Sequence, residues 1–191
     1  MPGHDREAMR KREALRRSFR PVRLRLLFIG ESPPASGRFF YQGDSGLYRA
    51  IRDAFRAIDA SITDASFLTI FQGSGCYLID LCPKPVDHLD LKLRQAACRA
   101  SEASLARTIA RLQPPAIATV VRSIEDNVAQ AASLAHWHGP FIHLPYPGRW
   151  SRYRTGFVDT LLPAVGSLLR QWNLRHIDEG LENEPDQAGR Y

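Results

Sequence analysis

The sequence predicts an α/β protein, a three-layer α/β/α sandwich around a central, mainly parallel four-stranded sheet. Short apolar segments typical of buried strands alternate about four times with longer segments of helical pattern. This alternation is typical of parallel strands that are joined by helices on both faces of a sheet. A length of 191 residues and a hydrophobic content of 44% suffice for one such domain with a sizeable core.

The first strand and the first helix of the domain have clear local signals. Residues 24–30 form a short apolar run that ends in glycine, which is the pattern of a buried strand. Residues 31–43 are rich in Pro, Ser and Gly and predict a loop. Asp44 or Ser45 can cap a helix that runs to about residue 59, because the apolar residues of this segment recur on one face.

Two further strands lie in the middle of the chain. Residues 76–81 form the second apolar run, and residues 90–112 have a helical pattern that a pair of prolines ends. Residues 116–121 predict the third strand. Ser123 is placed to cap a helix that reaches about residue 135.

The last strand and the last helix complete the domain. Residues 140–144 predict the fourth strand, residues 145–154 a loop rich in Pro, Gly and aromatic residues, and residues 155–172 a helix. We therefore divide the chain into a basic arm or helix at residues 1–22, an α/β domain at residues 23–175, and an acidic tail at residues 176–191.

The positive charge of the protein is concentrated at its N-terminal end. Residues 1–25 hold nine basic and three acidic residues, so this segment alone carries the net charge of +6 of the whole chain. A basic arm suits contact with the phosphates of a nucleic acid. A solvent-exposed, arginine-rich helix without a specific partner explains the same composition, and both interpretations stay open.

The chain shows no signal for membranes or metals. It contains no apolar run of about 18 residues and no apolar stretch after its basic start, so we expect a cytoplasmic protein that does not bind membranes. The three cysteines, Cys76, Cys82 and Cys98, are odd in number and form no Cys-x-x-Cys pair. This pattern favours reduced, buried thiols over a disulfide framework, a zinc site or an iron–sulfur cluster, and we expect no cofactor.

Three chemically unusual loops follow the predicted strands, at residues 30–43, 80–88 and 145–154. In parallel sheets, ligands bind outside the carboxyl ends of the strands. Because these ends share one edge of the sheet, we expect the three loops to be neighbours around a binding site.

The first loop displays one carboxylate, Glu31, beside Ser32 and two prolines. It lacks the glycine patterns of dinucleotide and phosphate loops, and its prolines remove backbone donors that a phosphate would need. The rings of Phe39, Phe40 and Tyr41 follow directly, and flat rings beside a fixed carboxylate suit a planar ligand such as a nucleobase. Alternatively, the loop only connects a strand to a helix, and its aromatic side chains fill the core.

The other two loops also carry candidate binding residues. Asp80 ends an apolar run, where a carboxylate needs a ligand or partners such as the backbone N–H groups of the next turn. In the last loop, arginines alternate with aromatic residues. This pattern is typical of a loop that contacts a nucleic-acid backbone and inserts a side chain between bases; the alternative is a surface loop with a buried tryptophan. Its candidate DNA-binding residues are Pro145, Tyr146, Pro147, Gly148, Arg149, Trp150 and Arg152.

Taken together, the loops resemble motifs of the uracil-DNA glycosylase superfamily. Residues 30–33 (Gly-Glu-Ser-Pro) are similar to the Gly-Glu-Ala-Pro-Gly of its iron–sulfur class, and residues 37–46 to the next motif with one extra residue. Residues 77–80 (Tyr-Leu-Ile-Asp) stand where that class has Tyr-Ile-Thr-Asn. Residues 144–148 (Leu-Pro-Tyr-Pro-Gly) resemble the Leu-Pro-Asn-Pro-Ser of mismatch-specific members, and the resemblance covers about residues 24–172.

The resemblance implies a role for each candidate residue. Glu31, with Ser32 beside it in the catalytic motif, would position or activate the water that attacks the anomeric carbon. Phe40 would stack on a flipped base, although the inserted residue leaves Phe39 or Tyr41 as alternatives, and Asp80 would face the base edge. The last loop would enter the minor groove, with Arg149 or Trp150 filling the vacated stack. Stacking and hydrogen bonds to the base would offset the cost of flipping, about a few kcal/mol.

Three departures from the family pattern have chemical consequences. The cluster-ligating cysteines are missing, which predicts a protein without an iron–sulfur cluster. Leu144 replaces the histidine that stabilises the departing base, and His143, one residue earlier in a strand, should face the opposite side. Asp80 replaces asparagine, and an ionised carboxylate only accepts hydrogen bonds, so it suits a cytosine-like amino group better than uracil. A protonated Asp80 could still bind uracil.

The resemblance thus implies a DNA N-glycosylase, an enzyme of base-excision repair that hydrolyses the N-glycosidic bond of a flipped, damaged or modified base. Because of Asp80, we expect that uracil is not its preferred substrate. Two alternatives remain: a non-catalytic nucleic-acid-binding protein of the same fold, and an enzyme that acts on a small nucleoside-like molecule. We expect a monomer that binds single- or double-stranded DNA.

Overall fold

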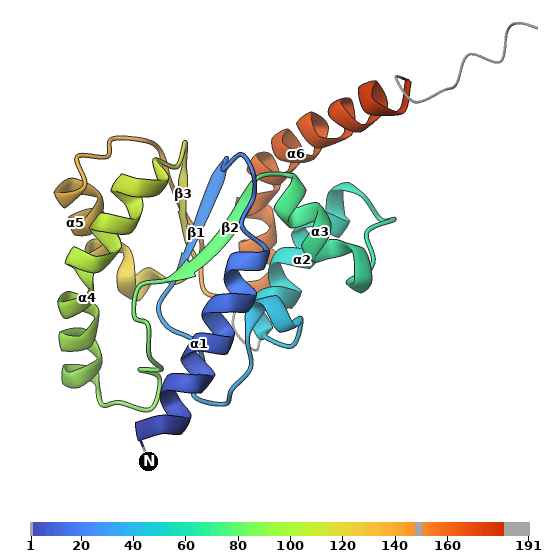
Figure 1. Ribbon diagram of the computed structural model, residues 1–191. Helices are drawn as coiled ribbons and strands as arrows, with labels where there is room; N and C mark the ends of the chain where they lie inside the picture. Colours follow the sequence, from blue (N-terminus) through green and yellow to red (C-terminus); the bar gives the residue numbers. More distant parts are fainter. Residues whose placement is uncertain (1, 148–150, 182–191) are drawn as a thin grey trace, which may run out of the picture.

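The protein contains one four-stranded sheet in which all strands are parallel. The structure is a computed structural model and describes residues 2–147 and 151–181. The strands are β1 (Leu26–Gly30), β2 (Cys76–Asp80), β3 (Ile117–Thr119) and β4 (Phe141–His143), in the order β2-β1-β3-β4 (Figure 1). The predicted fold class is therefore confirmed.

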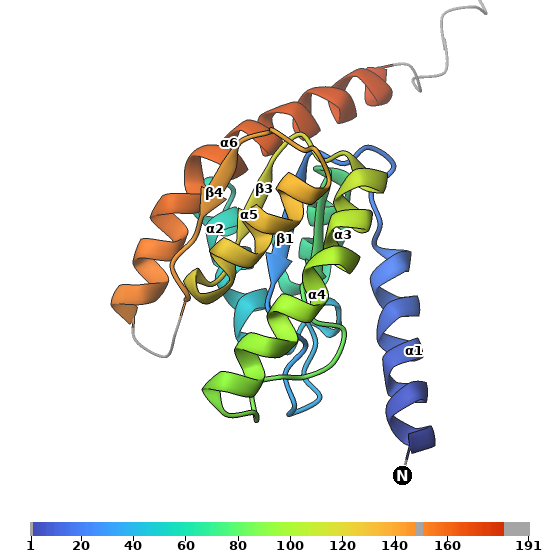
Figure 2. The same cartoon turned by 90° about the vertical axis from the view of Figure 1, so that its left-hand side faces the viewer.

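Helices cover both faces of the sheet and form the outer layers. On one face lie α4 (Leu91–Leu112) and α5 (Glu125–Leu134), and on the other lie α2 (Gly46–Ile58), α3 (Asp64–Gly73) and α6 (Ser151–Leu181), as Figures 1 and 2 show. All five residues of the central strand β1 are buried, as expected for a parallel strand with helices on both sides. No helix of the described ranges is both long and apolar enough to span a membrane.

Local capping explains two of the helices that begin near the site. Ser45 caps α2 by accepting a hydrogen bond from the Tyr48 backbone N–H, and Asp90 caps α4 in the same way through Leu93. These caps place the beginnings of both helices next to loops that follow strands.

Several element boundaries differ from the sequence-based expectations. Helix α3 has no counterpart among them; it begins at a capping box in which Thr63 pairs with Ser66 rather than with the usual Glu or Gln. The predicted cap at Ser123 is wrong, because this residue lies in a short 3₁₀ turn, η2 (Arg122–Ile124), before α5.

The last helix is longer than expected at both ends. Helix α6 begins at Ser151 and ends at Leu181, because good helix formers such as Leu and Arg continue beyond residue 172. The predicted loop at residues 145–154 and the predicted tail at residues 176–191 are therefore each partly helical. Residues 182–191 of that tail lie outside the described residues.

The basic N-terminal segment forms a helix, α1 (Pro2–Ser18), which docks on the domain beside strand β2 (Figure 1). The Gln72 side chain donates hydrogen bonds to the carbonyl oxygens of Ser18 and Arg20 at 3.1 and 3.0 Å. The Phe19 ring stacks on the ring of Tyr41 at a centroid distance of 5.3 Å. The end of this helix is thus a fixed part of the fold rather than a free arm.

The Tyr41 hydroxyl completes the hydrogen bonding of the outer strand. It accepts from the Leu78 N–H at 2.8 Å and donates to the Leu78 carbonyl at 3.0 Å. Burial raises the pKa of Tyr41 well above its ordinary value, so the hydroxyl keeps its proton. Tyr41→Phe leaves two buried backbone groups unpaired, and we expect the free energy of unfolding to fall by about 1–3 kcal/mol.

Urea denaturation measures this loss. Tyr146→Phe is the control, because that tyrosine is exposed and its hydroxyl has no hydrogen-bond partner among the described residues. Equal stability of the Tyr41→Phe protein and the unmodified protein would contradict the assignment of this hydroxyl to the strand edge.

Candidate functional site

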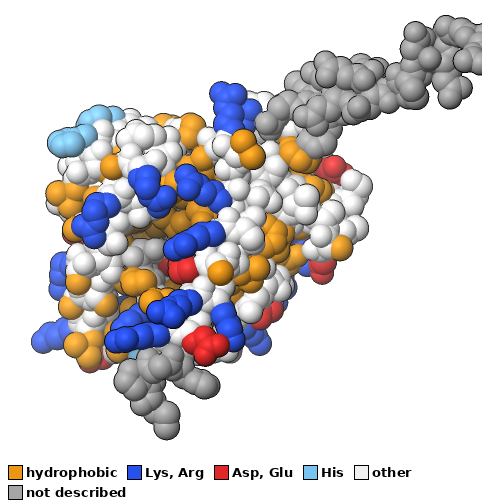
Figure 3. All heavy atoms as spheres, in the orientation of Figure 1, with side chains coloured by type: hydrophobic (Ala, Val, Ile, Leu, Met, Phe, Trp, Pro, Cys, Tyr) orange, Lys and Arg blue, Asp and Glu red, His pale blue; other side chains and the backbone are white. Residues whose placement is uncertain are grey.

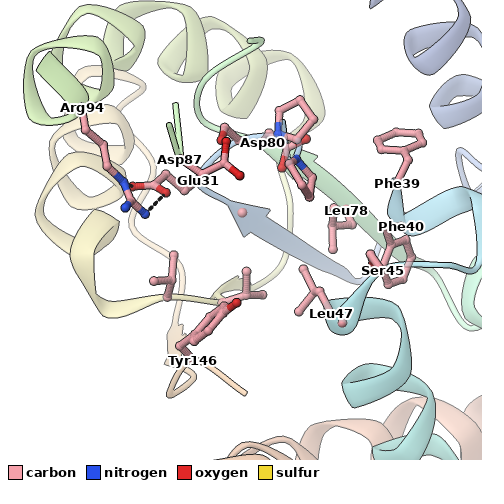
Figure 4. Close-up of a pocket in the computed structure, with 17 residues that line it drawn as sticks. Glu31, Phe39, Phe40, Ser45, Leu47, Leu78, Asp80, Asp87, Arg94 and Tyr146 are labelled. Carbon is pink, nitrogen blue, oxygen red and sulfur yellow. Dashed lines mark hydrogen bonds and ion pairs between the residues drawn. The ribbon is translucent and has the colours of Figure 1, made fainter. Parts of the chain in front are cut away.

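A cavity of about 320 Å³ opens at the carboxyl edge of the sheet. It is lined by Glu31 and its neighbours after β1, by Asp80 at the end of β2 and Asp87 after it, by Val121 after β3 and by Tyr146 after β4 (Figure 4). The expectation that the three loops meet around one site is thus confirmed. Ligand pockets range from about 300 to 1,000 Å³, so the volume suits a ligand of nucleobase size.

Glu31 lies directly after β1 and is held by an arginine from α4. The Arg94 Nε donates to Glu31 Oε1 at 2.7 Å, and a terminal nitrogen of the same guanidinium donates to Oε2. The carboxylate is only 11% exposed. The Cys98 sulfur lies 4.0 Å from Glu31 Oε1. Because burial raises the pKa of this thiol to about 12, Glu31 faces a neutral thiol rather than a thiolate.

Asp80 ends β2 and is paired with an arginine from α1. The Asp80 side chain is 8% exposed, and its Oδ2 accepts from a terminal nitrogen of Arg16 at 2.5 Å. Burial raises the pKa of Asp80 to about 6, while the Arg16 charge acts in the opposite direction. Among the described residues, Asp80 thus accepts from an arginine and not from the backbone N–H groups of the following turn, which was the alternative explanation.

Gly30 makes the close approach of Asp80 possible. A Cβ atom at position 30 would lie 2.8 Å from Asp80 Oδ1, so a larger residue would have to displace the carboxylate. The two residues face each other in the register of β1 and β2. The glycine at the end of the first strand thus leaves the space that the Asp80 carboxylate occupies.

The three aromatic candidates separate into two groups. Phe39 and Phe40 are buried and line the cavity, at the opposite end from Glu31 and Arg94 in Figure 4. Phe40 packs edge-on against Tyr48 with the ring centroids 5.9 Å apart, which makes it a rigid wall. Tyr41 is absent from the cavity lining, because its hydroxyl is turned to the backbone of Leu78.

Ser32 joins the first two loops to each other. Its Oγ accepts a hydrogen bond from the Val86 N–H at 3.2 Å, and the carboxylate of Asp87 accepts from the Ala35 N–H at 3.1 Å. Ser32 lines the cavity, but this contact gives it a positioning role beside Glu31. Both contacts keep the two loops at a constant spacing.

The loop after β4 is described only in part. Tyr146 is 65% exposed and lines the mouth of the cavity, and the flanking Pro145 and Pro147 are at least half-buried. The remaining candidates for DNA binding lie outside the described part of the loop. They are Gly148, Arg149, Trp150 and the side chain of Arg152.

His143 lies away from the cavity, as expected. The side chain is exposed and faces Glu125 and Thr119, with its Nδ1 3.6 Å from the Glu125 carboxylate. Leu144, which replaces the histidine of the resembled family, is fully buried. No imidazole therefore faces Glu31 from this strand.

Sequence reasoning missed both arginines that hold the carboxylates. Arg94 and Arg16 stand 63 and 64 positions from their partners, and an arginine within a helix has no local pattern that marks such a contact. The three cysteines are free and buried. Within residues 2–147 and 151–181, no three His, Cys, Asp or Glu side chains form a group that could hold a metal ion.

Comparison with known proteins adds no family to this picture. No protein-family model matches the sequence, and a search of curated proteins finds no significant match. The similarity to uracil-DNA glycosylases thus stays a prediction from short motifs. The arrangement of the cavity itself carries the functional argument.

Proposed function

We propose that this protein is a DNA N-glycosylase that hydrolyses the bond between a flipped base and its deoxyribose. One observation carries the proposal: Glu31 and Phe40 from the loop after β1 and Asp80 from the end of β2 line one cavity of about 320 Å³. A carboxylate for water, a ring for stacking and a second carboxylate for the base edge are the parts that base excision needs. The proposal keeps the expectation of a cytoplasmic monomer that acts on single- or double-stranded DNA.

In this mechanism Glu31 is the general base. A water oxygen forms a bond to the anomeric carbon, the N-glycosidic bond breaks, and its electron pair leaves with the base. The water proton passes to Glu31 and finally to the released base. A carboxylate has about four lone-pair sites; Arg94 occupies two of them and the Cys98 thiol faces Oε1, so a site remains for the water.

Asp80 sets the choice of base in this proposal. Its pKa of about 6 means that the carboxyl is mostly ionised at pH 7.5 and only accepts hydrogen bonds. An edge with an amino donor, as in cytosine and its modified forms, complements this group. The O4 of uracil would face negative charge, so we infer a substrate other than uracil.

Base release from end-labelled oligonucleotides tests the proposal. Single and double strands would carry uracil, hypoxanthine, xanthine, mismatched thymine or modified cytosines, and cleavage at abasic sites would report release. We expect release of a base with an amino donor, at a rate at least tenfold above that of uracil. Release of none of these bases by the folded protein would reject the glycosylase proposal.

The ion pair of Glu31 with Arg94 favours one alternative, a non-catalytic nucleic-acid-binding protein. Arg94 donates to both carboxylate oxygens, which leaves fewer lone-pair sites for an attacking water. DNA binding without base release would select this alternative. Loss of both binding and release would direct the search to small nucleoside-like molecules.

A further inference from the structure

A second cavity, of about 300 Å³, lies behind the first, between α1 and α4 and against the outer side of β2. Glu13, Arg16, Arg17 and Arg20 line it from the N-terminal segment. Their spacing of three or four positions places them on one side of α1 and its last turn, since Arg20 N–H still donates to the Arg17 carbonyl at 3.1 Å. The N-terminal segment therefore presents its basic side to this cavity.

Helix α4 supplies the facing wall. Ser104, Thr108 and Arg111 line the cavity and follow one another at intervals of four and three residues, which places them on one face of the helix. The floor is formed by Tyr77 of β2, which is 6% exposed. Both walls are regular helices packed on the sheet, so the geometry of the cavity is largely preformed.

The arginines around this cavity differ in whether they have acidic partners. Arg16 donates to Glu13 and Asp80, and its side chain is 9% exposed, so it is committed to these partners. Arg17, Arg20 and Arg111 are exposed, and none of them has an acidic partner among the side chains described at residues 6–147 and 153–173. Three free guanidinium groups thus surround one opening.

The face of the molecule that bears α1 and α4 shows this charge directly. Lys and Arg side chains gather there around a hollow, with few acidic side chains between them (Figure 3). Exposed arginines also continue along α1 to Arg10 and Arg6, beyond the cavity. A single small anion would leave these arginines unused, whereas a chain of phosphates could engage them together.

We propose that the cavity between α1 and α4 binds backbone phosphates of DNA. The planar guanidinium fork matches phosphate oxygens with two parallel hydrogen bonds, and the Ser104 hydroxyl adds a donor. Asp80 lines both cavities but is paired with Arg16, so Arg17, Arg20 and Arg111 are the arginines left for a phosphate. The choice of DNA rests on the proposed function, whereas the phosphate chemistry follows from the arginines alone.

The test compares two triple variants with equal loss of charge. The cavity variant is Arg17→Gln/Arg20→Gln/Arg111→Gln, and the control is Arg56→Gln/Arg99→Gln/Arg170→Gln, which changes exposed arginines outside this lining. Fluorescence anisotropy would give the Kd for an undamaged duplex at several salt concentrations between about 50 and 200 mM. Phosphate contacts make the affinity fall steeply over this range. Circular dichroism would show that both variants are folded.

We expect the cavity variant to bind duplex DNA at least about tenfold more weakly than the unmodified protein, and the control to change by less than about threefold. The slope of log K against log salt should fall by about two to three in the cavity variant, about one for each lost phosphate contact. Equal losses in the two variants, or no loss in the cavity variant, would overturn the proposal.

Binding of inorganic phosphate distinguishes a site for a free anion from a site for DNA. If inorganic phosphate alone binds at micromolar concentration and only the cavity variant loses it, while duplex binding is unchanged, the site serves a free phosphate and the DNA assignment is overturned. Duplex binding needs no base release. A protein that binds DNA through these arginines and releases no base would retain this inference and reject only the proposed catalysis.

Discussion

Replacement of Glu31 by glutamine is expected to lower the rate of base release by about 10²–10⁴-fold, the usual contribution of a general base. An amide has nearly the same size and can still accept from Arg94, but it cannot take the water proton. The Kd for DNA should stay within about threefold, because Glu31 makes no phosphate contact in this mechanism. Single-turnover release from a labelled oligonucleotide, with DNA in slight deficit, measures the chemical step.

Asp126→Asn is the matched control, because this exposed carboxylate lies on α5 and outside the lining of the cavity. Its release rate should equal that of the unmodified protein. Retention of more than about a tenth of the activity by the Glu31→Gln protein would remove Glu31 from the role of base. The mechanism would then need another group to activate the water.

The second large effect is expected from Asp80→Asn, which should raise uracil release by about tenfold to a hundredfold. The asparagine amide can accept from uracil N3–H and donate to O4, and a good bidentate contact of this kind is worth about 1–3 kcal/mol. Release of the base with an amino donor should fall at the same time. Measured with both substrates, the ratio of the two rates reports the change of preference independently of any loss of folded protein.

The pH dependence of the unmodified protein supplies a further test of the same assignment. Because burial raises the pKa of Asp80 to about 6, the carboxyl becomes a donor below that pH, and relative uracil release should rise between pH 7.5 and 5. The Asp80→Asn protein should keep a constant ratio over this range. A constant ratio in both proteins would show that Asp80 does not face the base.

The same titration affects stability in a defined direction. The folded protein holds the Asp80 proton more tightly than the unfolded chain, whose aspartate has a pKa near 3.8. Between about pH 4 and pH 6 the folded state therefore binds more protons, so this group lowers the free energy of unfolding as the pH rises through that window. The difference in urea stability between the unmodified and Asp80→Asn proteins, measured across the window, isolates this contribution.

The fold and the position of the site followed from local patterns. Apolar runs alternate with helical segments, and the carboxyl ends of parallel strands share one edge of the sheet, so the sequence alone predicts that the loops of Glu31 and Asp80 meet. The helix cap at Ser45 is local as well, because Ser45 bonds to a residue three positions later; the similar cap at Asp90 was not among the predictions. Helix α3 was missed because its capping box uses a serine in place of a longer side chain.

The sequence by itself determined the sheet, the edge that carries the cavity and the residues that follow each strand. Only the tertiary structure decided that Arg94 holds Glu31, that Arg16 holds Asp80, and that Tyr41 turns to the strand while Phe40 faces the cavity. Strand and helix patterns repeat over a few residues, whereas an ion pair between residues more than 60 positions apart depends on how whole elements pack. The partners of buried charges are set by that packing, which no short stretch of sequence encodes.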